Sequence, residues 1–226
     1  MPTHIFPSDS SEAVLNGLAW DGAHFYLGRQ DTPQELYKLS SSFEYLETIT
    51  LVDLNSAVVV DLTFLNGRAY VADNGGKILE YLMPDWSWVG EPSTLYINDV
   101  KGITNDGTAL WTVMGGSTVY KWKIVASGLA NDGIYYTSRG RLDGIAFDGK
   151  DFWAYDYTGN EIVKFGVDNW DGGSFPTDPN TGTPNILDTF QAFASGDGRG
   201  MTFTWEGRTT PTLWLNARSY GIWKFQ

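Results

Sequence analysis

Charged and amide side chains recur at two points of a repeated pattern in this sequence. One set opens or directly precedes short apolar runs: Asn16, Asp61, Lys101, Asp143 and Arg199. A second set follows the aromatic-centred run that comes next along the chain: Arg29, Asp73, Asn74, Asp156, Tyr157 and Arg218. If the fold brings the two sets together, their carboxylates could hold a hard cation, and their arginine and aspartate side chains could bind a polar ligand such as a sugar.

Three of these aspartates, Asp61, Asp143 and Asp156, are the candidate metal ligands, or bases for a lactonase-like or lyase-like enzyme. A second interpretation stays open beside this one, because Asp and Asn also occur where they cap turns. Under that interpretation Lys101, Arg199 and Arg218 only balance the charge. Catalysis is the least favoured interpretation, since the copies of the pattern differ at these positions and no base is paired with a nucleophile.

Other catalytic and cofactor motifs are absent from the sequence. The chain has no cysteine, which excludes a disulfide framework, a thiolate metal site and a cysteine nucleophile. The two histidines, His4 and His24, are too few and too far apart for a histidine-rich metal site. We find no phosphate-binding glycine loop, dinucleotide fingerprint or Gly-x-Ser-x-Gly turn. We therefore predict no cofactor other than Ca²⁺.

The pattern that carries these residues is a repeat with five copies. The clearest copy reads Gly-Ile-Ala-Phe-Asp-Gly at 144–149, Phe-Trp-Ala-Tyr-Asp at 152–156 and Glu-Ile-Val-Lys-Phe at 161–165. The copies begin near residues 17, 61, 102, 144 and 200, so their spacings are 44, 41, 42 and 56 residues. A repeat of this period is typical of solenoids and propellers.

Each copy predicts four antiparallel strands. Asp-Gly or Asn-Gly between two β-rich runs indicates a tight hairpin in most copies, and a third run follows it. A more variable fourth strand is expected at 43–51, 94–97, 134–137 and 186–193. Sheets of this kind bury their faces by packing side by side around an axis. We therefore predict a single all-β domain over residues 1–226 that folds as a five-bladed β-propeller. The aromatic residues of the first two runs would fill the space between neighbouring blades.

The two ends of the chain are expected to close the ring. The sequence stops directly after the third strand of the fifth copy, and residues 3–7 are an extended segment outside the repeat. We therefore predict that residues 3–7 pair with the strand around 222–225, which would hide an edge that otherwise promotes aggregation. A Gly- and Pro-rich insertion loop is expected at 166–185.

The copy at 144–165 resembles blades of the NHL and gluconolactonase-like group of propellers. This resemblance covers nearly the whole chain and implies a propeller fold, and the gluconolactonase likeness also implies Ca²⁺ at the converging carboxylates. The lactonase group usually has six blades, whereas this chain has residues for five. Because the same repeat type occurs in lactonases, lyases, binding proteins and scaffolds, the resemblance does not select a function.

Composition narrows the partners. The net charge of −12 disfavours nucleic acid and anionic membranes, and no apolar stretch is long enough for a spanning helix. The first eleven residues do not form a signal peptide, so a soluble protein is expected, in the cytoplasm, on a cell surface or in a virion.

Four tryptophans outside the repeat could contact a glycan or protein partner, or simply pack under loops: Trp86, Trp88, Trp170 and Trp205. The leading hypothesis is a non-enzymatic binding, adhesion or structural module, recognising a carbohydrate or receptor or belonging to a larger assembly. The alternative is the metal-dependent enzyme.

Overall fold

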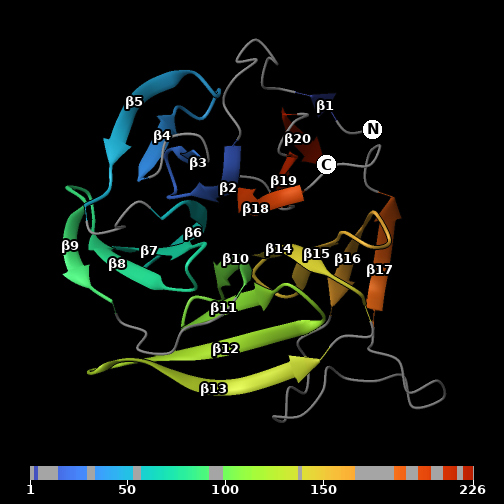
Figure 1. The fold of residues 1–226 in the computed structure, drawn as a ribbon. Helices are drawn as coiled ribbons and strands as arrows, with labels where there is room; N and C mark the ends of the chain where they lie inside the picture. The colour runs from blue at the N-terminus through green and yellow to red at the C-terminus, as the bar shows by residue number, and fades with distance from the viewer. Residues whose placement is uncertain are drawn as a thin grey trace.

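The strands of this protein form five antiparallel sheets around a central axis (Figure 1). The computed structural model describes residues 3–4, 15–29, 34–52, 57–91, 99–136, 139–165, 186–191, 198–204, 211–217 and 221–225. Each sheet has four strands, and the innermost strand of each contacts the innermost strand of the next. The predicted five-bladed propeller is confirmed. The part of the chain that is described contains no helix long and apolar enough to cross a membrane.

The strands occupy four equivalent positions from the axis outward. The innermost strands are β2 (Leu15–Trp20), β6 (Val59–Leu65), β10 (Val100–Asn105), β14 (Leu142–Phe147) and β18 (Gly198–Thr204). The second strands are β3 (Phe25–Arg29), β7 (Arg68–Asp73), β11 (Ala109–Met114), β15 (Phe152–Asp156) and β19 (Thr212–Ala217). The third strands are β4 (Glu35–Leu39), β8 (Ile78–Leu82), β12 (Thr118–Val125), β16 (Glu161–Phe165) and β20 (Gly221–Phe225). The outermost strands are β5 (Tyr45–Thr50), β9 (Ser87–Gly90), β13 (Gly128–Tyr136), β17 (Ile186–Gln191) and β1 (Thr3–His4). Blades 1 to 5 are numbered by their innermost strands in this order.

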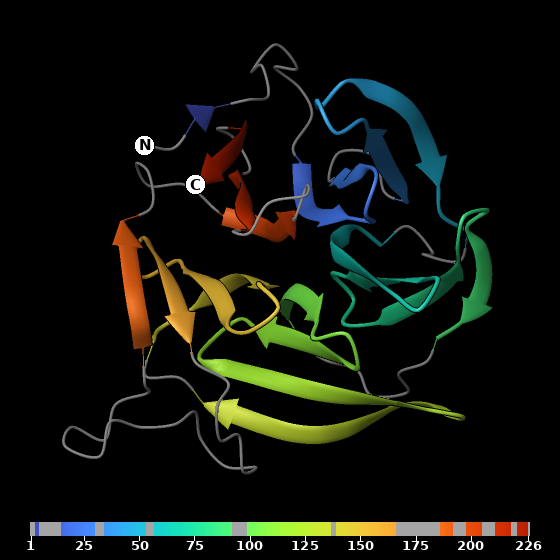
Figure 2. The ribbon, with the colours of Figure 1, turned by 180° about the vertical axis from the view of Figure 1, so that it is seen from behind.

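The N-terminal strand completes blade 5, as the sequence predicted. Thr3 pairs with Lys224 and His4 with Trp223, both antiparallel. Figure 2, which views the ring from behind, shows β1 beside β20. Residues 5–7 of the predicted closing strand and the predicted insertion loop at 166–185 lie outside the described residues.

A recurring aspartate explains the turn of the repeat. Asp148 Oδ1 accepts the backbone N–H groups of Lys150 at 2.9 Å and Asp151 at 2.7 Å, and Oδ2 accepts the indole N–H of Trp153 at 2.7 Å. Asp106 makes the same bonds to the backbone and to Trp111, and Asp21 makes them to the backbone and to the hydroxyl of Tyr26. The hairpin turn and the aromatic residue of the next strand are therefore fixed by one carboxylate.

Aromatic residues pack between neighbouring blades, as predicted. The ring centroids are 4.9 Å apart for Tyr26 and Phe64, and 5.8 Å apart for Trp153 and Phe203. A basic residue on the third strand covers several of these rings: the amino group of Lys164 lies 4.9 Å from the Trp153 ring, and Lys121 and Lys224 lie similarly over Trp111 and Trp214. This cross-strand pair explains why lysine recurs before a large apolar residue in the repeat.

The outermost strand of blade 2 differs from the expectation. It is β9, which directly follows a four-residue turn after β8, and it does not lie at 94–97. Its residues Ser87, Trp88 and Val89 are exposed, so this strand needs no alternation of apolar and polar side chains. The expected fourth strand of blade 3 is also too short, because β13 starts at Gly128.

Candidate functional site

The innermost strands all run in the same direction and define two faces of the ring. We call the face where these strands begin the proximal face and the face where they end the distal face. Near its start each innermost strand has an irregular register with the second strand, as between Val59 and Asp61 or between Leu142 and Gly144. Such bulges re-aim side chains at the mouths of closed β-structures. The predicted ligand residues Lys101 and Asp143 lie at these bulges.

Two of the predicted aspartates on the second strands cap turns at the proximal face. Asp73 Oδ1 accepts the N–H of Lys77 at 2.8 Å, and Asp156 Oδ1 accepts the N–H groups of Thr158 at 2.9 Å and Gly159 at 3.1 Å. Burial raises the pKa of Asp73, while its bonds to backbone N–H groups oppose that rise. The turn-capping interpretation therefore describes both side chains.

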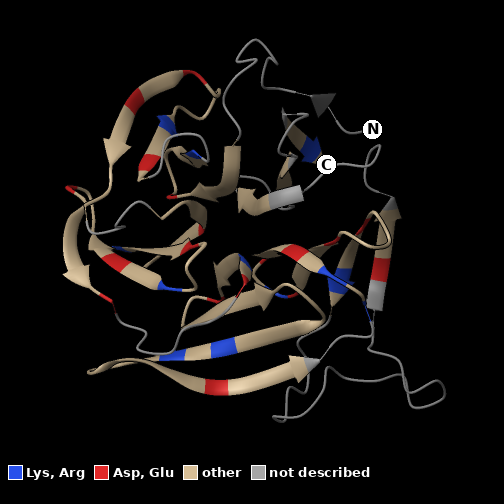
Figure 3. Cartoon of the chain, viewed as in Figure 1, with Lys and Arg blue, Asp and Glu red and all other residues tan. Residues whose placement is uncertain are grey.

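The predicted basic and aromatic residues make contacts with their own blades. Arg29 Nη1 lies 2.7 Å from Glu35 Oε2, and Lys101 forms an ion pair with Asp99. The fully buried Asp143 receives the Nε–H of Arg141 at 2.6 Å, and the Arg141 guanidinium lies 4.5 Å from the ring centroid of Tyr157. Figure 3 shows that charged residues are spread over the blades.

Asp61 stands one residue later in its copy of the repeat than Asn16, Lys101 and Asp143 stand in theirs. It occupies the position at which the other four blades have Gly17, Gly102, Gly144 and Gly200. Its Oδ1 accepts the N–H of Leu18 in blade 1 at 3.2 Å, and its Oδ2 accepts the N–H of Ile103 in blade 3 at 3.0 Å. Asp61 is 0% exposed, and burial raises the pKa of its carboxyl well above the usual range although backbone N–H groups oppose this.

Neighbouring inner strands approach each other closely at the level of Asp61. A Cβ atom added to Gly200 would lie 2.2 Å from the carbonyl carbon of Gly17, and one added to Gly102 would lie 2.9 Å from the Cα of Gly144. Only glycine allows neighbouring backbones to approach this closely. We call this level the septum. It separates the space at the proximal face from the space at the distal face.

The proximal face has a small pocket of about 120 Å³ beside the septum. Asn16, Lys101 and Asn74 line it together with Asp99 and three valines. Asn16 also joins two blades, since its Nδ2 donates to the carbonyl of Val59 at 3.2 Å. Three of the candidate residues, Asn16, Asn74 and Lys101, are thus brought together, whereas Arg29, Asp73, Asp143, Asp156 and Tyr157 do not line this pocket.

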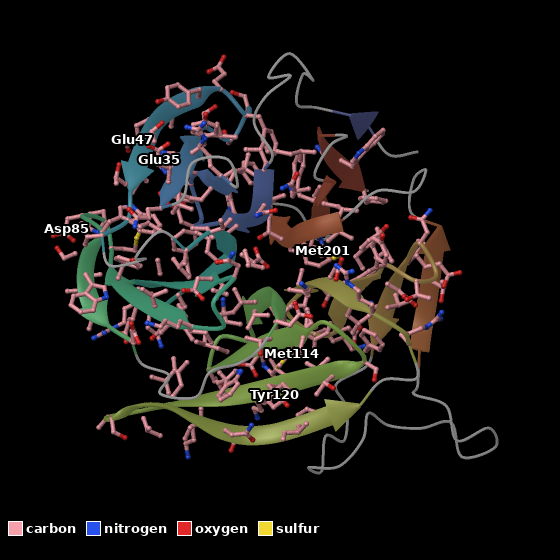
Figure 4. All side chains as sticks on the ribbon, in the orientation of Figure 1. Glu35, Glu47, Asp85, Met114, Tyr120 and Met201 are labelled. Atoms are coloured by element: carbon pink, nitrogen blue, oxygen red, sulfur yellow. The ribbon has the colours of Figure 1, made fainter. Side chains whose placement is uncertain are left out.

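The distal face has a larger cavity of about 310 Å³, lined by all five innermost strands and the turns after two of them. Its aromatic residues are Trp20, Phe147 and Phe203, and its polar side chains are Thr63, Thr104, Asn105, Asp106 and Thr202. Met201, labelled near the axis in Figure 4, lies at its inner end. Sequence reasoning missed this cavity. The available signal was Asn105, which stands where the other four copies have Trp20, Phe64, Phe147 and Phe203.

Asn105 is held by the neighbouring blade. Its Nδ2 donates to Thr63 Oγ1 at 2.8 Å and to the carbonyl of Phe64 at 3.0 Å. Next to it, burial raises the pKa of Asp106, but hydrogen bonds from Thr108, Trp111 and Ala109 outweigh burial and hold this pKa below the usual range. Asp106 is therefore ionised at neutral pH and acts as a hydrogen-bond acceptor.

The metal prediction stays a prediction. Within the described ranges, no group of three or more His, Asp and Glu side chains is arranged to hold a metal ion. Asp61, Asp143 and Asp156 have the separate partners given above. The positions of Arg218, Trp170 and Trp205, and the side chain of Arg199, lie outside the described residues.

The two other predicted surface tryptophans differ. Trp86 packs inside blade 2 and against blade 1, with ring centroids 5.5 Å from Tyr26 and 6.1 Å from Tyr81. Trp88 on β9 is 45% exposed. Only Trp88 of this pair is therefore placed to meet a partner without rearrangement.

Comparisons with known proteins relate this chain to others by structure alone. No protein-family model matches the sequence, and no curated protein matches it. The crystal structure of Myxococcus xanthus glutaminyl cyclase is similar with a TM-score of 0.69 and 14% identity, covering 99% of this chain and 92% of that one. The computationally designed Ika8 protein is similar with a TM-score of 0.51 and 9% identity, covering 93% of this chain and 70% of that one. At these identities the likeness shows a shared fold, and no family is assigned by it.

Proposed function

We propose that this protein is a binding module that takes a small neutral ligand with several hydroxyl groups, such as a sugar residue, in the distal cavity. The observation that carries the proposal is the lining of that cavity, which combines aromatic rings with hydroxyl, amide and carboxylate groups. Ligand pockets typically start near 300 Å³, so about 310 Å³ fits a ligand of monosaccharide size.

The chemistry of the lining supports a neutral polyol. Trp20, Phe147 and Phe203 offer apolar surfaces for the C–H face of a sugar ring, while threonine hydroxyls donate and accept hydrogen bonds. The described residues that line the cavity include no Lys, Arg or His, and Asp106 is ionised, so this lining would repel an anionic ligand.

Binding is favoured over catalysis at this cavity. Among the described lining residues Asp106 is the one titratable side chain, and both oxygens of this carboxylate accept hydrogen bonds from the chain itself. A general acid or base needs a partner group and a pKa near the working pH. The described lining provides neither.

A glycan array followed by calorimetry tests the proposal. We expect Trp20→Ala to weaken binding at least tenfold, because it removes an aromatic wall, and Thr202→Val to weaken it about 3- to 10-fold by removing one hydrogen bond. Trp88→Ala is the matched control, because Trp88 lies on the outer strand β9. Binding that is lost in Trp88→Ala and retained in Trp20→Ala would move the ligand to the outer surface and overturn the proposal.

A second candidate function is an enzyme acting at the proximal face. Two observations favour it: the fold is shared with a glutaminyl cyclase, and the proximal pocket places the ion pair of Lys101 and Asp99 beside Asn16. The alternative drawn from the sequence, a metal-dependent lactonase or lyase, would also act at this face.

Two assays test this candidate: cyclisation of peptides with an N-terminal glutamine, and lactone hydrolysis with and without Ca²⁺. An enzyme of this kind should lose turnover in Lys101→Met. It should keep turnover in Lys38→Met, because the Lys38 side chain forms an ion pair with Glu47 on the outer strands, away from the proximal pocket. Absence of turnover in both assays would exclude these two reactions and would leave the binding proposal intact.

A further inference from the structure

Backbone N–H groups from two blades meet at the septum. A Cβ atom added to Gly200 would lie 2.2 Å from the nitrogen of Leu18, and one added to Gly102 would lie 3.0 Å from the nitrogen of Ile145. Leu18, Ile103 and Ile145 hold the same position in the repeat, directly after the glycine. Of these three, the N–H groups of Leu18 and Ile103 meet at one point, the carboxyl group of Asp61.

Backbone N–H groups that meet in this way bind acceptor oxygens, since each N–H carries a partial positive charge. The group that accepts them here is a side chain of the protein. Asp61 brings its carboxylate to the N–H groups of Leu18 and Ile103, and it does so from the one blade that has no glycine at this position. No solvent reaches this carboxylate, because Asp61 is 0% exposed.

We propose that the septum is a binding site of the size of one carboxyl group, and that Asp61 is its built-in ligand. The two carboxyl oxygens of Asp61 act as acceptors that link the inner strands of blades 1, 2 and 3. The site is distinct from the distal cavity, and the proposal does not depend on the ligand proposed for that cavity.

Chemical rescue tests this inference. Asp61→Ala keeps the Cβ atom and removes the carboxyl group, which leaves a space that formate fits. Formate should raise the melting temperature of Asp61→Ala in a saturable way, because a ligand that binds only the folded state stabilises it by mass action. Pivalate has the same charge and is too bulky for the space, so it should give no such rise.

Asp148→Ala is the matched control, together with the wild-type protein. Asp148 is also a buried carboxylate that accepts backbone N–H groups, but it lies in a turn at the distal face. Equal shifts by formate in all three proteins, or equal shifts by formate and pivalate in Asp61→Ala, would overturn the proposal. If Asp61→Ala folds only with added salt, the refolding yield becomes the readout, and equal yields in formate and pivalate would count against the site.

Discussion

Asp61 and Asp148 are two buried aspartates that accept backbone N–H groups, yet their pKa values are shifted in opposite directions. At Asp61 burial is opposed only by backbone N–H groups, and the pKa is raised well above the usual range. At Asp148 burial also raises the pKa, but two backbone N–H groups, the indole N–H of Trp153 and the charge of Lys164 outweigh it, so the pKa is lowered. Of the two inner strands that neighbour β6, β2 has no charged residue and β10 has Lys101.

We therefore expect Asp61→Asn and Asp148→Asn to change the pH dependence of stability with opposite signs. Asp61 binds its proton more tightly in the folded state, so the free energy of unfolding of the wild type should fall, relative to Asp61→Asn, as the pH rises above about 4. Asp148 binds its proton less tightly when folded. The advantage of the wild type over Asp148→Asn should therefore be present above about pH 4 and shrink as the pH falls below it.

Urea unfolding from pH 3 to pH 8 measures both differences. Parallel profiles of the two variants would contradict the opposite shifts.

At the scale of elements, the sequence predicts the buried strands well and the exposed outer strands unevenly, since β5 and β17 lie within their expected ranges and β9 does not. The hairpins of the first two strands were predictable because Asp21, Asp106 and Asp148 fix both the turn and the following aromatic residue. The outer strand β9 was missed because its side chains Ser87, Trp88 and Val89 face solvent, which removes the apolar alternation that marks a strand. The closing strand β1 was predictable because the repeat left blade 5 one strand short.

Deleting residues 1–7 tests the closing strand. We expect a lower melting temperature, or association of the chain, because the deletion exposes the backbone edge of β20. Calorimetry and size-exclusion chromatography measure the two effects. Deleting only residues 1–2 is the control, since it keeps Thr3 and His4. An unchanged, monomeric product of the longer deletion would show that β1 does not hold the ring closed.

For the whole molecule, the ring was predictable from five similar copies, but the position of the candidate site was not. Sequence reasoning placed all polar candidates at the proximal face, where most of them prove to be engaged by turns and ion pairs. The distal cavity is formed by residues such as Thr63, Thr104 and Thr202, whose spacing in sequence follows the repeat and gives no sign of a ligand. Only the closed ring brings them within reach of one molecule.

The closeness of the blades at the septum predicts a contrast between two glycines. Gly200→Ala should destabilise the protein by about 1–3 kcal/mol or more, because the new methyl group would overlap the backbone of blade 1. Gly116→Ala should stay within about 0.5 kcal/mol of the wild type, because a Cβ atom there meets nothing within 4 Å. Chemical denaturation measures both, and a mild effect of Gly200→Ala would show that the inner strands can move apart.

Because Asp61 bridges blades 1 and 3 and is 0% exposed, its side chain obstructs a passage along the axis. Any molecule that enters the distal cavity would therefore have to leave by the side from which it came, and the opposite side of the ring would remain available for attachment to another structure.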